Sequence, residues 1–176
     1  MANVGIRPTQ KLNACISCRI WFASPWNSAY GSDDPRAQNV AGKSLPANVT
    51  AGPLTHSELR GLYARSRFVV IPILPSETDN GTTAVLEAMA MERPVISTAT
   101  SGRSDVLEDG VNCILVPPCD PAALRGAIED LWNDPEKCRR LGAAARAKVV
   151  REHGIDQWLA GLTSAAQELN DSGRPR

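Results

Sequence analysis

Two carboxylates, Asp79 and Glu87, stand eight positions apart around a loop and the start of an expected helix. Thr83 and Glu87 are four apart, so they share one helix face, and helical side chains lean toward the N-terminus, which points Glu87 back at the loop. The backbone N–H groups of residues 81–84 are the unpaired donors of the first turn and can seat an anion. Carboxylates beside an anion seat suit a phosphate-bearing molecule with sugar hydroxyls, so the pattern predicts a sugar-nucleotide site.

The elements that position these groups follow in the order strand, loop, helix, strand. An apolar run from Phe68 to Leu74 predicts a buried strand, and the segment after it is rich in Pro, Ser, Asp, Asn and Gly. A helix is expected to open near Thr82 and to stop by Glu92, because the next residue, Arg93, precedes a proline and is pushed out of helical geometry. A second strand is expected from Pro94 to Ser97. Strands alternating with helices indicate an α/β domain with a parallel sheet.

Each of these site residues also has an ordinary structural interpretation. Asp79 can be a helix cap and Glu87 a surface residue of the helix. Thr82 and Thr83 can be helix-start residues, and Gly81 can serve only the turn. These alternatives stay open from the residues alone.

The same segment resembles the signature of retaining glycosyltransferases of the GT-B fold, family 4, also called glycosyl transferases group 1. That signature is a Pro-Ser loop, an acidic residue, a Gly-containing turn, a Glu eight positions later, then Ala-Met-Ala and Pro-Val. Asp79 stands where the family usually has Glu, and Glu77 competes with it for this role.

Two downstream segments extend the resemblance. Residues 98–105 are similar to a Thr-x-x-Gly-Gly-x-x-Asp/Glu loop, with Ser101 in place of one Gly. Residues 109–118 are similar to an Asp-Gly-x-x-Gly-x-Leu-Val-x-Pro pattern, with Cys113 in place of the second Gly. Several motifs in the right order are more specific than the acidic pair alone.

The resemblance implies a role for each matched residue. Glu87 would hydrogen-bond the ribose hydroxyls of a nucleotide-diphosphate sugar, and Asp79 would be the catalytic residue that holds the donor sugar near the transferring carbon. Gly81, Thr82 and Thr83 would belong to the donor-binding turn, whose amides neutralise the diphosphate. No metal and no cofactor are implied, because the helix dipole and basic side chains stabilise the leaving group.

The resemblance covers about Leu45 to Leu162. We therefore expect an irregular segment at 1–44, a Rossmann-like α/β lobe at 45–169 that forms the C-terminal half of a GT-B fold, and a disordered tail at 170–176. Nothing matches the acceptor-binding lobe, and Arg19, Arg36 and Lys43 do not stand in the family's diphosphate-binding pattern. We expect an incomplete enzyme, weakly active or inactive alone, that works with a separate N-terminal lobe or another subunit.

Composition excludes some partners. Lys and Arg number 19, as do Asp and Glu, so the net charge is zero and gives no support for nucleic-acid binding. No apolar run is long enough to span a membrane and the N-terminus lacks an h-region, so we expect a soluble cytoplasmic protein, with peripheral membrane attachment left open. Cys15 and Cys18 have no second Cys/His pair at zinc spacing, and the odd total of five cysteines favours a reducing compartment.

Several other elements carry clear local signals. Residues 55–58 form a capping box, and the Asp-Pro pairs at 120–121 and 134–135 each supply an N-cap with a proline at N1. One helical turn is expected at 105–109, strands are expected at 19–22, 45–49 and 113–116, and a final helix after Gly154 leaves Trp158 exposed if no other lobe covers it. Two other functions remain: a non-catalytic interaction module that keeps the lobe's fold, and a sugar-nucleotide epimerase.

Overall fold

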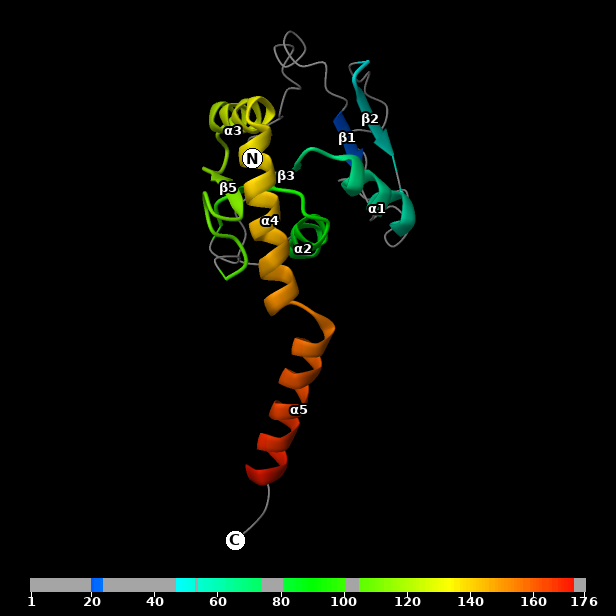
Figure 1. Cartoon of the computed structure of the whole chain (residues 1–176), viewed down its shortest axis with the longest axis vertical. Helices are drawn as coiled ribbons and strands as arrows, with labels where there is room; N and C mark the ends of the chain where they lie inside the picture. Colours follow the sequence, from blue (N-terminus) through cyan, green and yellow to red (C-terminus); the bar gives the residue numbers. More distant parts are fainter. Residues whose placement is uncertain (1–19, 24–46, 53, 74–80, 101–104, 173–176) are drawn as a thin grey trace, which may run out of the picture. The chain divides into compact units, whose positions relative to one another are not determined.

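The computed structural model describes residues 20–23, 47–52, 54–73, 81–100 and 105–172. The chain divides into two compact units, residues 1–60 and 61–176, whereas the sequence analysis begins the lobe at Leu45. The elements are β1 Ile20–Ala23, β2 Val49–Gly52, α1 His56–Arg65, β3 Val69–Ile71, α2 Thr82–Ala90, β4 Val95–Thr98, β5 Cys113–Val116, α3 Pro121–Asn133, α4 Pro135–Glu152 and α5 Ile155–Ser172 (Figure 1).

The first unit contains a pair of parallel strands. β1 and β2 run in register from Ile20 opposite Val49 to Ala23 opposite Gly52. The strand expected at 19–22 is confirmed, whereas the strand expected at 45–49 begins only at Val49. The capping box is also confirmed, since Oε2 of Glu58 accepts from the Thr55 amide at 2.8 Å and from its hydroxyl at 2.7 Å. These bonds hold the pKa of the Glu58 carboxyl below its usual value.

The second unit is built on a three-stranded parallel sheet in the order β3-β4-β5. The strand expected at 68–74 is shorter, because the paired residues run only from Val69 to Ile71 and residues 74–80 lie outside the described part. Strand β4 is buried along its whole length, as expected for the middle strand of a parallel sheet that is covered on both faces.

The main core lies on one face of this sheet, against α3 and α4. Ile96 on β4, Val116 on β5, Leu131 on α3 and Leu141 on α4 share one buried cluster. Successive strand side chains point to opposite faces, so Ile96 faces this cluster while its buried neighbours Val95 and Ser97 face the other side. The second of the two helices, α4, also packs against α2 (Figure 1).

Both Asp-Pro signals are confirmed as helix starts. The carboxylate of Asp120 accepts from the amides of Ala122 and Ala123 at 3.0 and 2.9 Å, and that of Asp134 accepts from Lys137 at 2.8 Å. Each cap satisfies first-turn donors that would otherwise lack a partner.

Packing of α4 against the C-terminal end of α2 depends on a glycine. A Cβ at Gly142 would lie 2.4 Å from the carbonyl oxygen of Glu92, so no other residue fits this contact without a shift. A guanidinium N–H of Arg146 on α4 donates to the carbonyl of Ala90, the last residue of α2. These contacts fix the end of α2 relative to α4.

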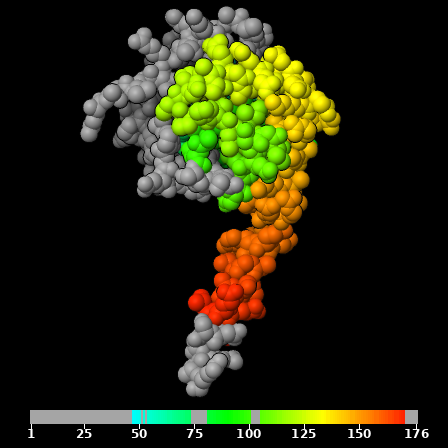
Figure 2. Space-filling view, turned by 90° about the vertical axis from the view of Figure 1, so that its left-hand side faces the viewer, coloured from blue at the N-terminus to red at the C-terminus, as the bar shows by residue number. Residues whose placement is uncertain are grey.

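Two expectations from the sequence are wrong. Residues 105–109 form a turn and an isolated bridge rather than a helical turn. The expected tail begins too early, because α5 continues to Ser172. The apolar residues of α5 recur at helical spacing and are exposed: Ile155, Trp158, Leu159, Leu162 and Leu169. Figure 2 shows the surface of this helix, coloured orange to red. The exposure expected for Trp158 is confirmed at 61%.

Candidate functional site

Polar groups tie together the carboxyl ends of β3 and β4. The hydroxyl of Thr98 accepts from the amide of Ile73 at 3.0 Å, and the hydroxyl of Ser97 donates to the carbonyl of Ile71 at 3.1 Å. Both hydroxyl side chains are buried. Open parallel sheets bind ligands outside the carboxyl ends of their strands, so these bonds fix the geometry of the expected binding edge.

Helix α2 starts at this same edge. Its N-cap is Gly81, in the left-handed region at φ 82°, and no side chain caps the helix. A Cβ at Gly81 would lie 2.6 Å from Cδ1 of Ile73, so the glycine serves both the backbone conformation and the close approach. In α1, α3 and α4 the N-cap side chain accepts from first-turn amides, whereas the N-cap of α2 is a glycine and makes no such bond.

Glu87 lies on α2 and is half-buried. Its Oε2 accepts a hydrogen bond from the hydroxyl of Tyr63 on α1 at 3.2 Å. Within the described ranges, neither a further hydrogen bond nor an ion pair of this carboxylate is found. Burial, followed by the negative charge and the hydrogen bond of Glu87, raises the pKa of Tyr63, so the phenol stays protonated.

The structure places four of the five predicted site residues on one element. Gly81, Thr82, Thr83 and Glu87 form the start and the second turn of α2. Asp79 and its competitor Glu77 lie outside the described residues, so the catalytic assignment stays a prediction. Tyr63 was not among the expected site residues. Its signal was present, since a tyrosine in the apolar stripe of a helix needs a partner for its hydroxyl once buried.

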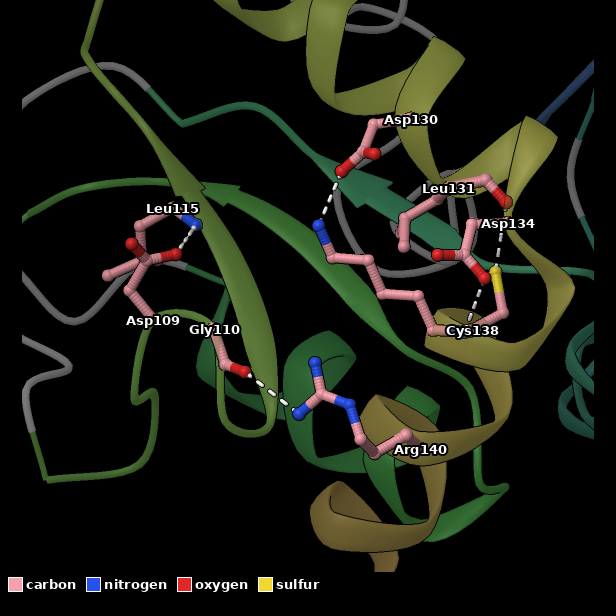
Figure 3. Close-up of polar contacts among 9 residues, drawn as sticks. Asp109, Gly110, Leu115, Asp130, Leu131, Asp134, Cys138 and Arg140 are labelled. Carbon is pink, nitrogen blue, oxygen red and sulfur yellow. Dashed lines mark hydrogen bonds and ion pairs between the residues drawn. The ribbon is translucent and has the colours of Figure 1, made fainter.

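The downstream motifs form a loop that is held by its own side chains. Asn112 is buried, accepts from the amide of Glu108 at 2.9 Å and donates to the carbonyl of Val106 at 3.1 Å. Asp109 accepts from the amide of Leu115 at 2.8 Å (Figure 3). These bonds replace the internal ones of a helical turn, which explains why residues 105–109 are not helical.

Side chains of helix α4 bond to the same loop and to helix α3. Arg140 donates to the carbonyl of Gly110 at 3.2 Å, and the thiol of Cys138 lies 3.2 Å from the carbonyl of Leu131, to which it donates (Figure 3). Burial raises the pKa of the Cys138 thiol, consistent with a packing role. Residues 98–100 of the other downstream motif belong to or follow β4, and its residues 101–104 are outside the described part.

No cluster of three or more metal-ligating side chains occurs in the described part of the chain. Cys15 and Cys18 fall outside it. A search of the described helices likewise finds none long and apolar enough to cross a membrane.

The sequence matches known glycosyltransferases. Residues 28–134 match the family model described as Glycosyl transferases group 1. The chain is 31% identical over 147 residues to a D-inositol 3-phosphate glycosyltransferase of Geodermatophilus obscurus, covering 81% of this chain and 32% of that protein. It is 42% identical over 88 residues to a putative glycosyltransferase, EpsD, of Bacillus subtilis, covering 49% of this chain and 23% of that protein.

Solved structures agree on the fold. Sucrose-phosphate synthase from Thermosynechococcus elongatus is similar with a TM-score of 0.71 at 24% identity, over 88% of this chain and 39% of that one. The Anabaena protein Alr3699/HepE, solved in complex with UDP-glucose, is similar with a TM-score of 0.61 at 18% identity, over 85% of this chain and 49% of that one. The expected Rossmann-like α/β fold of GT-B proteins is thereby confirmed.

The chain spans about a third or less of the length of these two curated relatives, at 32% and 23%. The match to the family model over residues 28–134 nevertheless covers more than half of this chain. The chain belongs to the glycosyl transferases group 1 family.

Proposed function

We propose that this chain binds a nucleotide-diphosphate sugar as the donor of a glycosyltransferase reaction. The proposal rests mainly on Glu87, a half-buried carboxylate whose described partner is a neutral phenol rather than a cation. Carboxylates are rarely buried without a compensating partner, so folding alone does not account for it. A ribose diol, which donates two hydrogen bonds to a carboxylate, would supply that compensation.

The start of α2 provides the second part of the proposed site. The diphosphate would accept from the first-turn amides, where the helix dipole favours negative charge and the N-cap residue is a glycine. Gly81 lets the backbone approach Ile73 at the edge of the sheet. The UDP-glucose complex of HepE, a structure with the same fold, supports a nucleotide sugar as the ligand class.

The reaction proposed is transfer of the sugar to an acceptor of unknown identity with the anomeric configuration kept. Asp79 would hold the donor sugar at the transferring carbon, and no metal would take part. Because the chain spans about a third or less of its relatives, we assign donor binding to it and the acceptor site to a separate lobe or subunit. Sugar transfer by the purified 176-residue chain alone would contradict this division.

The test is calorimetric titration of the purified chain with UDP, GDP and ADP. One nucleotide should bind, and Glu87→Ala should abolish the heat. Glu129→Ala is the matched control, because Glu129 is an exposed carboxylate on α3 whose partner is Arg125 on the same helix. Equal loss in both variants, or no binding by the folded wild type, would refute the proposal.

A second candidate is a non-catalytic interaction module, which the exposed apolar face of α5 favours. Such a module would bind none of the three nucleotides and would be insensitive to Glu87→Ala. The same titration therefore separates the two functions.

A further inference from the structure

The hydrogen bond from Tyr63 to Glu87 joins α1 and α2 through two residues that are 24 positions apart in the sequence. Tyr63 lies on α1 and is only 8% exposed, so its ring is held in place by the surrounding side chains. Its hydroxyl reaches Oε2 of Glu87 at 3.2 Å. A buried ring with two side-chain torsions is a rigid donor, whereas a glutamate alone samples many rotamers.

The hydrogen bond from Tyr63 uses only one of the acceptor positions of the Glu87 carboxylate. It occupies one lone pair of Oε2 and leaves Oε1 without a described partner. An ionised carboxylate offers about four acceptor positions, so three remain for hydroxyl donors. The neutral phenol also leaves the carboxylate its negative charge, which a lysine or arginine partner would have offset.

The consequence for a ligand follows from preorganisation. Ordering a rotamer-rich side chain at the moment of binding weakens the affinity, and a side chain that is already ordered avoids this cost. A carboxylate with one oxygen bonded and the other without a described partner matches a vicinal diol, in which two adjacent hydroxyls donate together.

We propose that Tyr63 is a positioning residue that orients the Glu87 carboxylate toward the vicinal diol of the donor's ribose. This inference rests on the proposed function. It adds a residue outside the motif segment and states how that residue acts, namely through Glu87 and without touching the ligand.

The experiment compares a ribonucleotide with its deoxy form. Whichever of UDP, GDP and ADP binds wild type is titrated together with its 2′-deoxy analogue, which lacks one of the two hydroxyls. Tyr63→Phe removes a single oxygen atom. We expect it to weaken binding of the ribonucleotide by about 10- to 20-fold, the lower end of the range for a hydrogen bond to a charged group, because the bond acts on the ligand only through Glu87. The affinity for the deoxy analogue should change by less than about twofold. The ratio of the two affinities should therefore be smaller in the variant than in wild type.

A role in structure alone would give a different result, weakening both ligands by the same factor. Ser66→Ala is the matched control, because it removes another hydroxyl next to α1, one that donates only to the carbonyl of Leu62 at 2.8 Å. It should leave both affinities unchanged.

The outcomes separate the two proposals. If the Glu87→Ala variant still binds the nucleotide, the proposal of a donor site at α2 is wrong. If Glu87→Ala abolishes binding but Tyr63→Phe leaves the ribonucleotide affinity unchanged, or weakens both ligands equally, only the positioning role is overturned.

A second measurement covers the case in which Tyr63→Phe fails to fold. The chain has two tyrosines, so wild type labelled with 3-fluorotyrosine gives two fluorine resonances, and Tyr30→Phe assigns them. The Tyr63 resonance should shift on addition of the ribonucleotide and much less with its deoxy form. An unchanged resonance in a protein that binds the nucleotide would overturn the inference.

Discussion

Replacing Gly142 on α4 by alanine should destabilise the protein, although alanine is the better helix former. Alanine is favoured over glycine in a helix interior by about 0.8–1 kcal/mol. At this position, however, the added Cβ would lie 2.4 Å from the carbonyl oxygen of Glu92, 3.1 Å from its carbonyl carbon and 3.3 Å from Cδ of Pro94. The nearest atom is backbone, so rotation of a side chain cannot relieve the contact.

The size of the effect follows from two opposing terms. Overpacking a well-packed core costs about 1–3 kcal/mol, and here the close contact lies at the high end of that range. Subtracting the helix-propensity gain leaves a net loss of about 1–2 kcal/mol in the free energy of unfolding. For a chain of this size that lowers Tm by about 2–8 °C.

Gly126 on α3 provides the matched control. It is also a glycine inside a helix, but a Cβ there would meet nothing within 4 Å. Gly126→Ala should therefore show the propensity gain alone and raise the free energy of unfolding by about 0.8–1 kcal/mol.

Urea unfolding followed by far-UV circular dichroism measures both variants against wild type. The expected result is a lower midpoint for Gly142→Ala and a higher one for Gly126→Ala, at unchanged slope. If Gly142→Ala is as stable as Gly126→Ala, then α4 does not approach Glu92 closely, and the fixed position of α2 that the donor site requires loses its support.

Three further results are expected. Asn112→Ala should lower the free energy of unfolding by about 2–4 kcal/mol in urea titrations, because it removes the side-chain partners of the Glu108 amide and of the buried Val106 carbonyl; a loss below about 0.5 kcal/mol would contradict this. In timed alkylation with peptide mapping, exposed Cys119 should react well before the buried Cys113 and Cys138, and equal rates would show that the core is open. Because burial and Glu87 raise the pKa of Tyr63, the folded state keeps a proton that an unfolded tyrosine loses above about pH 10. Above that pH the free energy of unfolding should fall by up to about 1.4 kcal/mol per pH unit more in wild type than in Tyr63→Phe, and parallel pH profiles would refute this.

The features predicted correctly from the sequence are those decided within a few residues. The Thr55 capping box and the Asp120 and Asp134 caps each involve donors no more than three positions away, so the chain fixes them locally. The same holds for the start of α2 at Thr82, which directly follows Gly81 of the turn.

The features that were missed depend on contacts distant in sequence or on a side chain replacing a backbone bond. The partner of Glu87 is 24 residues away, and no spacing rule links residues on two different helices. The turn before β5 looked helical because Asp105 to Asp109 has a suitable composition. The backbone of this turn instead bonds to the side-chain amide of Asn112. These bonds compete with the backbone hydrogen bonds that a helical turn would need. The register that brings Thr98 to Ile73 is likewise set by strand pairing.

The motif residues themselves divide into two kinds. The polar groups of Thr98, Asp109 and Asn112 are already bonded to backbone groups within the fold: those of Ile73, of Leu115, and of Glu108 with Val106. Folding alone explains these residues, so a chain could keep them after losing any chemistry. Their match to the family supports the fold rather than the reaction.

Folding alone does not explain Glu87, and a single substitution tests this. Glu87→Gln keeps an oxygen that can accept from Tyr63 but removes a half-buried negative charge, whose burial is costly without a cation. The free protein should therefore be as stable as wild type or more stable by up to about 1 kcal/mol, while nucleotide affinity falls at least tenfold. Urea unfolding and calorimetric titration of the same sample measure both quantities. A variant that loses more than about 1 kcal/mol of stability would show that the carboxylate is there for the fold, and the main argument for a donor site at α2 would fail.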